Sequence, residues 1–276
     1  LWQNAPLIDE FPAPGTVNAA LDAGSISIVE RLRNGAALRV AGIPDLPPEA
    51  SLIDQRINGL NRQLVENMAA RWGTSVQYVA GDPMQLIASG QADIAAGIEA
   101  NWQLTDRLDF SVPYLLHGDR LMVESRDDIA SFQDLGGRWI GIMDTDTGAG
   151  DRAQAWADSI SRTVRLYSTF EQTAADAMLV ENNADVVYGN SLKLIQHLEA
   201  NPNVLTLTER WYSREYFVFA MPANDPEFRL LVDYSIQELV KTAELATLTR
   251  PLMPPNSELP DFEVWYGTYP GNLPGF

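Results

Sequence analysis

The chain contains few of the residue types that carry covalent or metal chemistry. It has no cysteine and only two histidines, His117 and His197, which we expect to be surface or structural residues. This composition excludes disulfides, thiolate metal sites, a cysteine nucleophile and a histidine-rich metal centre. Neither a G-x-S-x-G nor an H-E-x-x-H motif occurs. We therefore expect no catalytic residue, no metal site and no cofactor.

The charge of the chain restricts its partners. It has 37 acidic and 19 basic residues, which gives a formal net charge of −18 at pH 7. Such a field repels phosphate backbones and anionic lipids, so we expect no nucleic-acid partner.

The sequence has no run of about 18 uncharged apolar residues, the length that a membrane-spanning helix needs. With 276 residues, of which 46% are hydrophobic, it predicts one large or two medium globular domains.

The elements that must position a site alternate between strands and helices. Short apolar runs predict strands, and apolar residues three and four positions apart predict helices. The predicted strands are 38–43, 76–79, 93–97, 120–123, 138–143, 163–167, 185–188, 204–207 and 216–221. The predicted helices are 26–34, 60–72, 83–89, 150–160, 170–181, 191–199 and 226–248, the last as one or two helices. The dipeptide Asn58-Gly59 predicts a hairpin-type turn.

This alternation predicts a two-lobed α/β protein with two mostly parallel sheets that are flanked by helices. Ligands of open α/β sheets bind beyond the carboxyl ends of the strands. Two lobes that face each other would therefore form a binding cleft. Stretches rich in Pro and Gly at 1–24 and 254–276 predict a linker and a tail.

Several segments, in order, resemble the extracellular solute-binding proteins of family 3, the receptors that feed ABC importers of polar amino acids. The segment most typical of that family is Arg107-Leu-Asp-Phe-Ser-Val-Pro-Tyr114. The others are Leu38-Arg-Val-Ala-Gly42, Ser89-Gly-Gln-Ala-Asp-Ile-Ala-Ala-Gly97, Phe132-Gln-Asp-Leu-Gly-Gly-Arg-Trp-Ile-Gly-Ile142 and Asn182-Asn-Ala-Asp-Val-Val-Tyr188. Their order and spacing hold from about residue 38 to residue 250.

The resemblance implies a type II periplasmic-binding fold with two crossover strands as the hinge. Those strands are expected near Leu121–Val123 and Phe217–Phe219. Closure of the lobes around a ligand would be a hinge motion. The implied division is 1–37 as an N-terminal linker and short helix, 38–121 plus 217–255 as lobe 1, 122–216 as lobe 2, and 256–276 as a C-terminal tail.

Four positions depart from the contacts that the resemblance implies for an α-amino acid. Leu104 stands where the family has the arginine that holds the ligand carboxylate, and leucine cannot form that ion pair. Asn190 stands where the family has the aspartate for the amino group. Ile43 and Leu46 replace an acid and an aromatic residue after the first strand. An α-amino acid held in the family's usual way is therefore not expected.

The candidate ligand contacts are instead acidic, amide and aromatic. They are Asp45, Glu99, Asn101, Trp102, Asp146, Thr147 and Asn190. Such a set suits a cationic or amine ligand through ion pairing and cation–π contact. Five of them have an alternative structural role: Asp45 as a turn residue, Asp146 as a helix cap, Trp102 as a packing residue, Glu99 as a solvated acid and Asn190 as a backbone partner. Arg120, Arg152 or Arg214 is the alternative partner for a ligand carboxylate.

The resemblance implies a monomeric, non-enzymatic receptor that presents a small polar solute to an ABC transporter permease. Its expected location is periplasmic or extracellular, and a membrane anchor outside this sequence stays open. The alternatives are a sensing domain of a membrane receptor with the same fold and, ranked last, a dehydratase-like enzyme. Glu99 could supply the general acid of such an enzyme, but Leu104 removes the anion clamp that its substrate would need.

Overall fold

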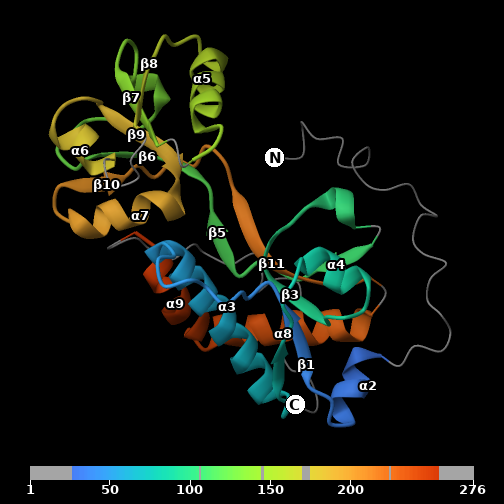
Figure 1. Cartoon of the computed structure of the whole chain (residues 1–276). Helices are drawn as coiled ribbons and strands as arrows, with labels where there is room; N and C mark the ends of the chain where they lie inside the picture. The colour runs from blue at the N-terminus through green and yellow to red at the C-terminus, as the bar shows by residue number, and fades with distance from the viewer. Residues whose placement is uncertain (1–26, 106, 144–145, 170–174, 224, 255–276) are drawn as a thin grey trace.

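The computed structural model places two lobes side by side, joined by two crossing segments (Figure 1). The predicted N-terminal linker and C-terminal tail lie outside the residues that it describes. Those residues are 27–105, 107–143, 146–169, 175–223 and 225–254.

The first sheet forms the centre of lobe 1. Its strands follow the order β2-β1-β3-β11-β4, and β5 also pairs with β11. Within the described residues β11 alone runs antiparallel to its neighbours, whereas β1 pairs in parallel with β2 and β3. The strands are β1 (Leu38–Ala41), β2 (Val76–Tyr78), β3 (Ile94–Glu99), β4 (Leu108–Phe110), β5 (Leu115–His117) and β11 (Glu215–Pro222).

The second sheet forms the centre of lobe 2. Its strands follow the order β10-β6-β9-β7-β8, and β7 pairs in parallel with β8 and β9. In the described part of this sheet only β6 runs against the rest, because it pairs antiparallel with both β9 and β10. The strands are β6 (Asp119–Glu124), β7 (Trp139–Met143), β8 (Arg165–Thr169), β9 (Val186–Asn190) and β10 (Leu205–Leu207). The predicted two-sheet α/β architecture is confirmed.

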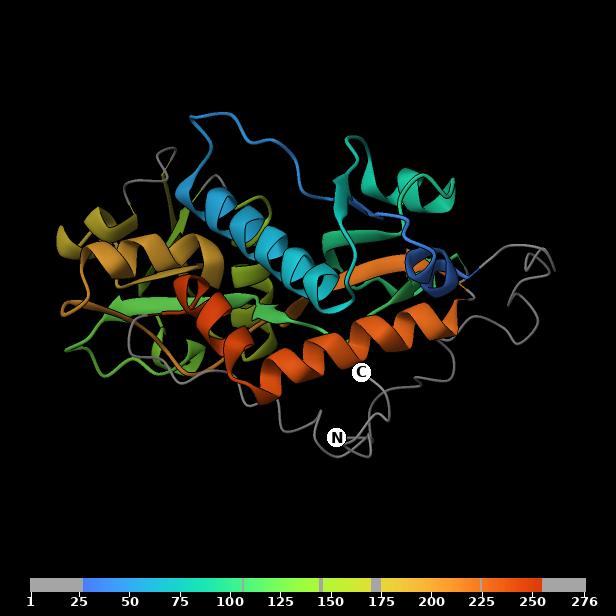
Figure 2. The ribbon, with the colours of Figure 1, turned by 90° about the horizontal axis from the view of Figure 1, so that it is seen from below.

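Helices cover both faces of each sheet because successive strand residues point to opposite faces. In β1, Val40 packs into the core beneath α3 and α8, and Ala41 packs into the core beneath α4 (Figure 2). The helices of lobe 1 are α2 (Ile28–Arg33), α3 (Leu52–Arg71), α4 (Pro83–Ala88), α8 (Pro226–Lys241) and α9 (Glu244–Thr249). Those of lobe 2 are α5 (Ala149–Ser159), α6 (Ala175–Val180) and α7 (Ser191–Ala200). None of the helices in the described ranges is long and apolar enough to span a membrane.

Two tightly packed segments carry the chain between the sheets. The first is Gly118, which separates β5 from β6, and the second is 208–214, which leads from β10 to β11. The expectation that 121–123 and 217–219 would cross is therefore a few residues off, since β6 and β11 each pair within one sheet. Gly118 has a φ of +147°, and a Cβ there would collide with the carbonyl oxygen of Ser213. Only glycine lets the two segments pass so closely.

The predicted turn at Asn58-Gly59 is wrong, because both residues lie inside α3. Ser51 caps this helix by accepting a hydrogen bond from the backbone N–H of Asp54. The apolar helical spacing starts earlier than predicted, at Ile53, and buries the helix against the first sheet. Tertiary packing thus overrides the local turn preference of Asn-Gly.

Other differences from the prediction are small. The short strands β4 and β5 were not predicted. The predicted helix 226–248 is two helices, broken at Ala243, whose φ is +59°. The predicted helix 170–181 is observed as α6, and its first part lies outside the described residues.

The lobes also touch away from the crossing, where α7 packs on α3. Leu192 and Ile195 of α7 belong to the hydrophobic core of lobe 1. Arg56 of α3 forms a two-point ion pair with Glu199 of α7, with nitrogen–oxygen distances of 2.7 and 2.8 Å. Helix α7 therefore reaches from the crossing to the outer contact between the lobes.

Candidate functional site

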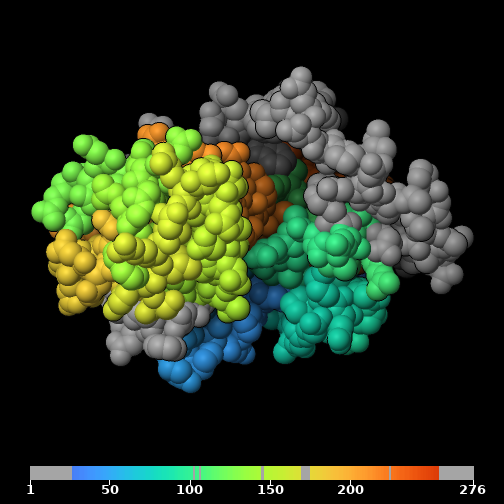
Figure 3. Space-filling view, turned by 90° about the horizontal axis from the view of Figure 1, so that it is seen from above, coloured from blue at the N-terminus to red at the C-terminus, as the bar shows by residue number. Residues whose placement is uncertain are grey.

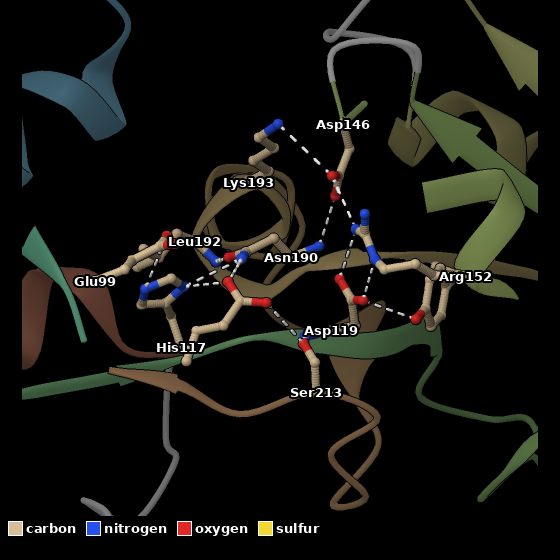
Figure 4. Close-up of polar contacts among 11 residues, drawn as sticks. Glu99, His117, Asp119, Asp146, Arg152, Asn190, Leu192, Lys193 and Ser213 are labelled. Atoms are coloured by element: carbon tan, nitrogen blue, oxygen red, sulfur yellow. Dashed lines mark hydrogen bonds and ion pairs between the residues drawn. The ribbon is translucent and has the colours of Figure 1, made fainter. Parts of the chain in front are cut away.

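Three strand ends and one helix start bring four polar side chains together at the crossing (Figure 4). Antiparallel pairing sets Glu215 opposite His117, and Phe217 opposite Glu99. The His117 Nδ1 lies 3.5 Å from Glu215 Oε2, and its Nε2 lies 3.9 Å from Glu99 Oε1. Asn190, which caps α7, adds its side chain to the same group. We call Glu99, His117, Asn190 and Glu215 the crossing cluster.

Asn190 determines which ring nitrogen of His117 carries the proton. The Asn190 Oδ1 accepts the backbone N–H of Leu192 at 3.1 Å, so its Nδ2 faces the His117 Nδ1, also at 3.1 Å. The amide nitrogen can only donate, so Nδ1 accepts and the proton lies on Nε2. Burial lowers the pKa of His117 from 6.5 to about 4, so the ring is neutral at pH 7.

The two glutamates of the cluster differ in their exposure to solvent. The Glu99 side chain is 61% exposed, and the Glu215 side chain is 39% exposed. Burial and the charge of Glu99 raise the pKa of Glu215, while a hydrogen bond from the Ser213 hydroxyl at 3.2 Å opposes the rise. A positive charge placed between these carboxylates would relieve their repulsion.

A second group, the arginine cluster, supports the first from lobe 2. It consists of Asp119, Asp146, Arg152 and Tyr188. Arg152 donates to both oxygens of the buried Asp119, at 2.6 and 3.0 Å, and to Asp146 at 3.0 Å. Tyr188 donates its hydroxyl to Asp119 at 2.8 Å. Asp146 in turn accepts the backbone N–H of Asn190 at 2.8 Å and so joins the two clusters.

The arrangement suits an ammonium ion better than a metal ion. Glu99, His117 and Glu215 each offer one ligand atom, and these atoms lie within 4.8 Å of one another. The two carboxylates are the acceptors that an ammonium ion would use, because the His117 Nδ1 already accepts from Asn190 and its Nε2 carries the proton. The two carboxylates also approach different ring nitrogens of His117. The free ring nitrogen, Nε2, carries a proton and cannot bind a metal in that state.

The structure brings some predicted site residues together. Glu99 and Asn190 share the crossing cluster, and Asp146 lies beside it in the arginine cluster. The alternative role of Asp146 as a helix cap is wrong, because Gly148 is the N-cap of α5 and no side chain caps that helix. The alternative role of Asn190 is confirmed, since its side chain accepts the Leu192 N–H.

Three other predicted residues contribute no side chain to either cluster. Asp45 is exposed and lines a pocket of about 410 Å³ whose wall includes Leu46 and Arg62 but no residue of either cluster. Asn101 accepts the backbone N–H of Gln103 within its own turn. Exposed Thr147 offers its backbone carbonyl to an arginine of the second cluster. The side chain of Trp102 lies outside the described part of the structure.

Of the three arginines expected as alternative partners for a ligand carboxylate, Arg120 and Arg152 are engaged elsewhere, whereas Arg214, directly before Glu215, is exposed. Leu104 is half-buried and packs against the core beside α4. Arg152 is held by two aspartates, and Arg120 donates to the Thr208 carbonyl while stacking 4.9 Å from the centre of the Trp211 ring. Neither guanidinium is free to bind a ligand carboxylate.

The sequence alone did not identify four residues of the two clusters: His117, Asp119, Tyr188 and Glu215. Of the two roles expected of His117, that of a surface residue is wrong, since it is 2% exposed, and it faces two acids. The available signal was its place directly before Gly118, the residue at which the chain changes sheet. Nothing in the local pattern of Glu215 distinguishes it from a surface acid.

The surface is hollowed between the lobes. In the space-filling view, the yellow-green surface of α5 faces the teal surface of lobe 1 across a hollow (Figure 3). Orange chain leading into β11 is visible within it. The crossing cluster therefore belongs to the region where the two lobes meet.

Comparisons with known proteins agree with this architecture. The profile of the bacterial extracellular solute-binding proteins, family 3, matches residues 38–252. A comparison with curated protein sequences finds no match. At their levels of identity, the solved structures below show likeness of fold alone.

Three solved structures are similar over most of their length. The unliganded, open L-cystine solute receptor of Neisseria gonorrhoeae has a TM-score of 0.67 and 19% identity, covering 83% of this chain and 97% of that one. An ancestral cationic amino acid solute-binding protein has a TM-score of 0.61 and 19% identity, covering 82% and 99%. An ancestral cyclohexadienyl dehydratase has a TM-score of 0.62 and 17% identity, covering 83% and 97%.

Proposed function

Because the chain belongs to the bacterial extracellular solute-binding proteins of family 3, we propose that it captures a small polar solute with a positively charged amine. The solute lies between the lobes at the crossing cluster, and the protein presents it to the permease of an ABC importer. The protein acts as a monomer in the periplasm or outside the cell. It performs no chemistry on the solute.

The pairing of Glu99 with Glu215 is the observation that carries this proposal. The two carboxylates lie within 4.8 Å of each other, and burial together with the charge of Glu99 raises the pKa of Glu215. Around them, Asp119 and Asp146 are already paired with Arg152. A cation is the ligand that removes the remaining repulsion.

The leucine at position 104 also favours a solute with a positively charged amine, because it removes a partner for a carboxylate. Leucine at that position provides no guanidinium for a ligand carboxylate, and Arg152 is already paired with Asp119. A solute whose binding depends on a carboxylate would meet the two glutamates instead, at a cost in electrostatic energy.

Capture depends on the two lobes approaching each other. In this proposal, the chain up to His117 together with the chain from Glu215 onward forms one rigid lobe, the second sheet and its helices form the other, and the crossing segments are the hinge. Glu99, His117 and Glu215 come from the first sheet, whereas Asn190 and Asp146 come from lobe 2. A solute at the crossing cluster would therefore touch both lobes.

Isothermal titration calorimetry with a panel of amines, amino acids and organic acids tests the proposal. The expected result is binding of amines, weakened at least about tenfold by Glu99→Gln or Glu215→Gln, since each removes a charged hydrogen-bond partner. Glu227→Gln is the matched control, because this glutamate is exposed on α8. Tight binding of acidic solutes alone, or equal binding by all four proteins, would contradict the proposal.

A further inference from the structure

The proton on the Nε2 of His117 has no acceptor. Among the described residues this buried nitrogen makes no hydrogen bond, although the whole residue is only 2% exposed. Buried N–H groups in native proteins are nearly always paired, so an unpaired one indicates a missing partner. Its nearest acidic oxygen, Glu99 Oε1, lies 3.9 Å away, which is beyond hydrogen-bond distance.

The neighbouring side chains hold this N–H in place without satisfying it. The side-chain amide of Asn190, a residue of lobe 2, donates a hydrogen bond to Nδ1. The Phe217 ring lies 4.5 Å from the imidazole, centre to centre. Glu99, in contrast, is 61% exposed and is held by no hydrogen bond in the described structure. Figure 4 shows Glu99 on the side of the ring that carries Nε2. A cation that draws this carboxylate toward itself would therefore reach the Nε2 edge of His117.

We propose that His117 is a specificity-determining residue whose Nε2–H donates to a neutral oxygen of the solute. The inference rests on the proposed function and names its solute class: amines with a hydroxyl or carbonyl oxygen on the carbon next to the one that bears the nitrogen. The amine pairs with Glu99 and Glu215, and the oxygen accepts from His117.

The geometry of the cluster sets this class. Because 3.9 Å separates Nε2 from the Glu99 oxygen, a nitrogen and an oxygen on neighbouring carbons of one solute can engage both groups at once. The oxygen must be neutral, since a carboxylate there would face Glu99 and Glu215. The ring donates at pH 7 without being charged, so it adds no attraction for an anion.

Matched pairs of amines that differ by one hydroxyl test the proposal: propylamine with isopropanolamine, and putrescine with hydroxyputrescine. The wild-type protein is expected to bind the hydroxylated member about tenfold more tightly, the effect of one hydrogen bond. His117→Phe should abolish this preference while both members still bind. His117→Gln, which keeps an N–H donor at the same reach, should retain part of it.

The outcomes separate this inference from the proposed function. Equal binding of both members by the wild type, or a preference that survives in His117→Phe, overturns the role of His117 and leaves the amine receptor standing. A loss of affinity for both members in His117→Phe, without any wild-type preference, would mean that His117 only positions Glu99. If no amine of either pair binds, the proposed function fails and this inference fails with it.

A measurement on the wild type keeps the proposal testable if His117→Phe does not fold. Nitrogen-15 NMR of the imidazole reports the tautomer, and the chain has only two histidines, so His197→Gln assigns the signals. A neutral ring with its proton on Nε2 is expected, with a shift of Nε2 on adding hydroxyputrescine but not putrescine. A proton on Nδ1, or identical responses to the two amines, would overturn the proposal.

Discussion

Acid should destabilise this protein through the single imidazole at the crossing. Burial lowers the pKa of His117 from 6.5 to about 4, so the folded protein keeps the ring neutral at a pH where the unfolded chain protonates it. The unfolded state thus binds more protons below pH 6.5. The contribution of His117 to stability is complete above pH 6.5 and is lost as the pH falls toward 4.

The size of this effect follows from the two pKa values. Between pH 7 and pH 5, a shift from 6.5 to about 4 removes about 2 kcal/mol from the free energy of unfolding. Asp233 acts in the opposite direction, because burial raises its pKa from 3.8 to about 6. Its carboxyl takes up a proton in the folded protein first, which adds about 1 kcal/mol over the same interval. The change in the wild-type free energy of unfolding between pH 7 and pH 5 is therefore smaller than the contribution of His117 alone.

Urea unfolding at pH 7 and pH 5 resolves the two contributions when variants are compared with the wild type. His117→Gln should lose about 2 kcal/mol less than the wild type on acidification, because glutamine does not titrate. Asp233→Asn should change the pH dependence in the opposite direction. If His117→Gln keeps the wild-type difference between the two pH values, the ring is not held neutral in the folded protein.

Three further changes have definite expected results. Gly59→Ala should raise the free energy of unfolding by about 0.5–1 kcal/mol in urea unfolding, because Gly59 is helical and no atom lies within 4 Å of an added Cβ; a loss of stability would contradict this. Gly118→Ala should destabilise by more than about 2 kcal/mol in the same assay, because its Cβ would meet the Ser213 carbonyl at a positive φ, and a neutral result would refute the close crossing. Asn190→Asp keeps the cap of α7 but sets a carboxylate against Nδ1, so an NMR titration should show the pKa of His117 rising from about 4; an unchanged pKa would refute the contact.

Much of the fold was predictable because its signals are local. The apolar spacing of a strand or helix depends on which face meets the core, so most elements of both lobes could be placed from hydrophobic period, whereas the short β4 and β5 could not. Val40 and Ala41 of β1 illustrate this, as they enter the cores on opposite faces of the first sheet. The turn at Asn58-Gly59 failed for the converse reason, since burial of the whole of α3 outweighs a two-residue preference.

The candidate site was only partly predictable. Glu99 and Asn190 were identified through the family's motif positions, and both lie in the crossing cluster. His117 and Glu215 were not identified, because their roles arise from antiparallel pairing of β5 with β11 across a long stretch of chain. No local pattern distinguishes a histidine that will be buried beside two acids from one that will face solvent.

The sequence by itself determined which reactive and charged side chains are present. The chain is acidic, has no cysteine and two histidines, and has leucine where a carboxylate-binding arginine would stand. Those facts depend on composition and order alone. The tertiary structure decided which of the acids meet, how far His117 is buried, and which of its nitrogens keeps the proton. Desolvation, register and the direction of a hydrogen bond from Asn190 are properties of the folded arrangement, and no single stretch of residues contains them.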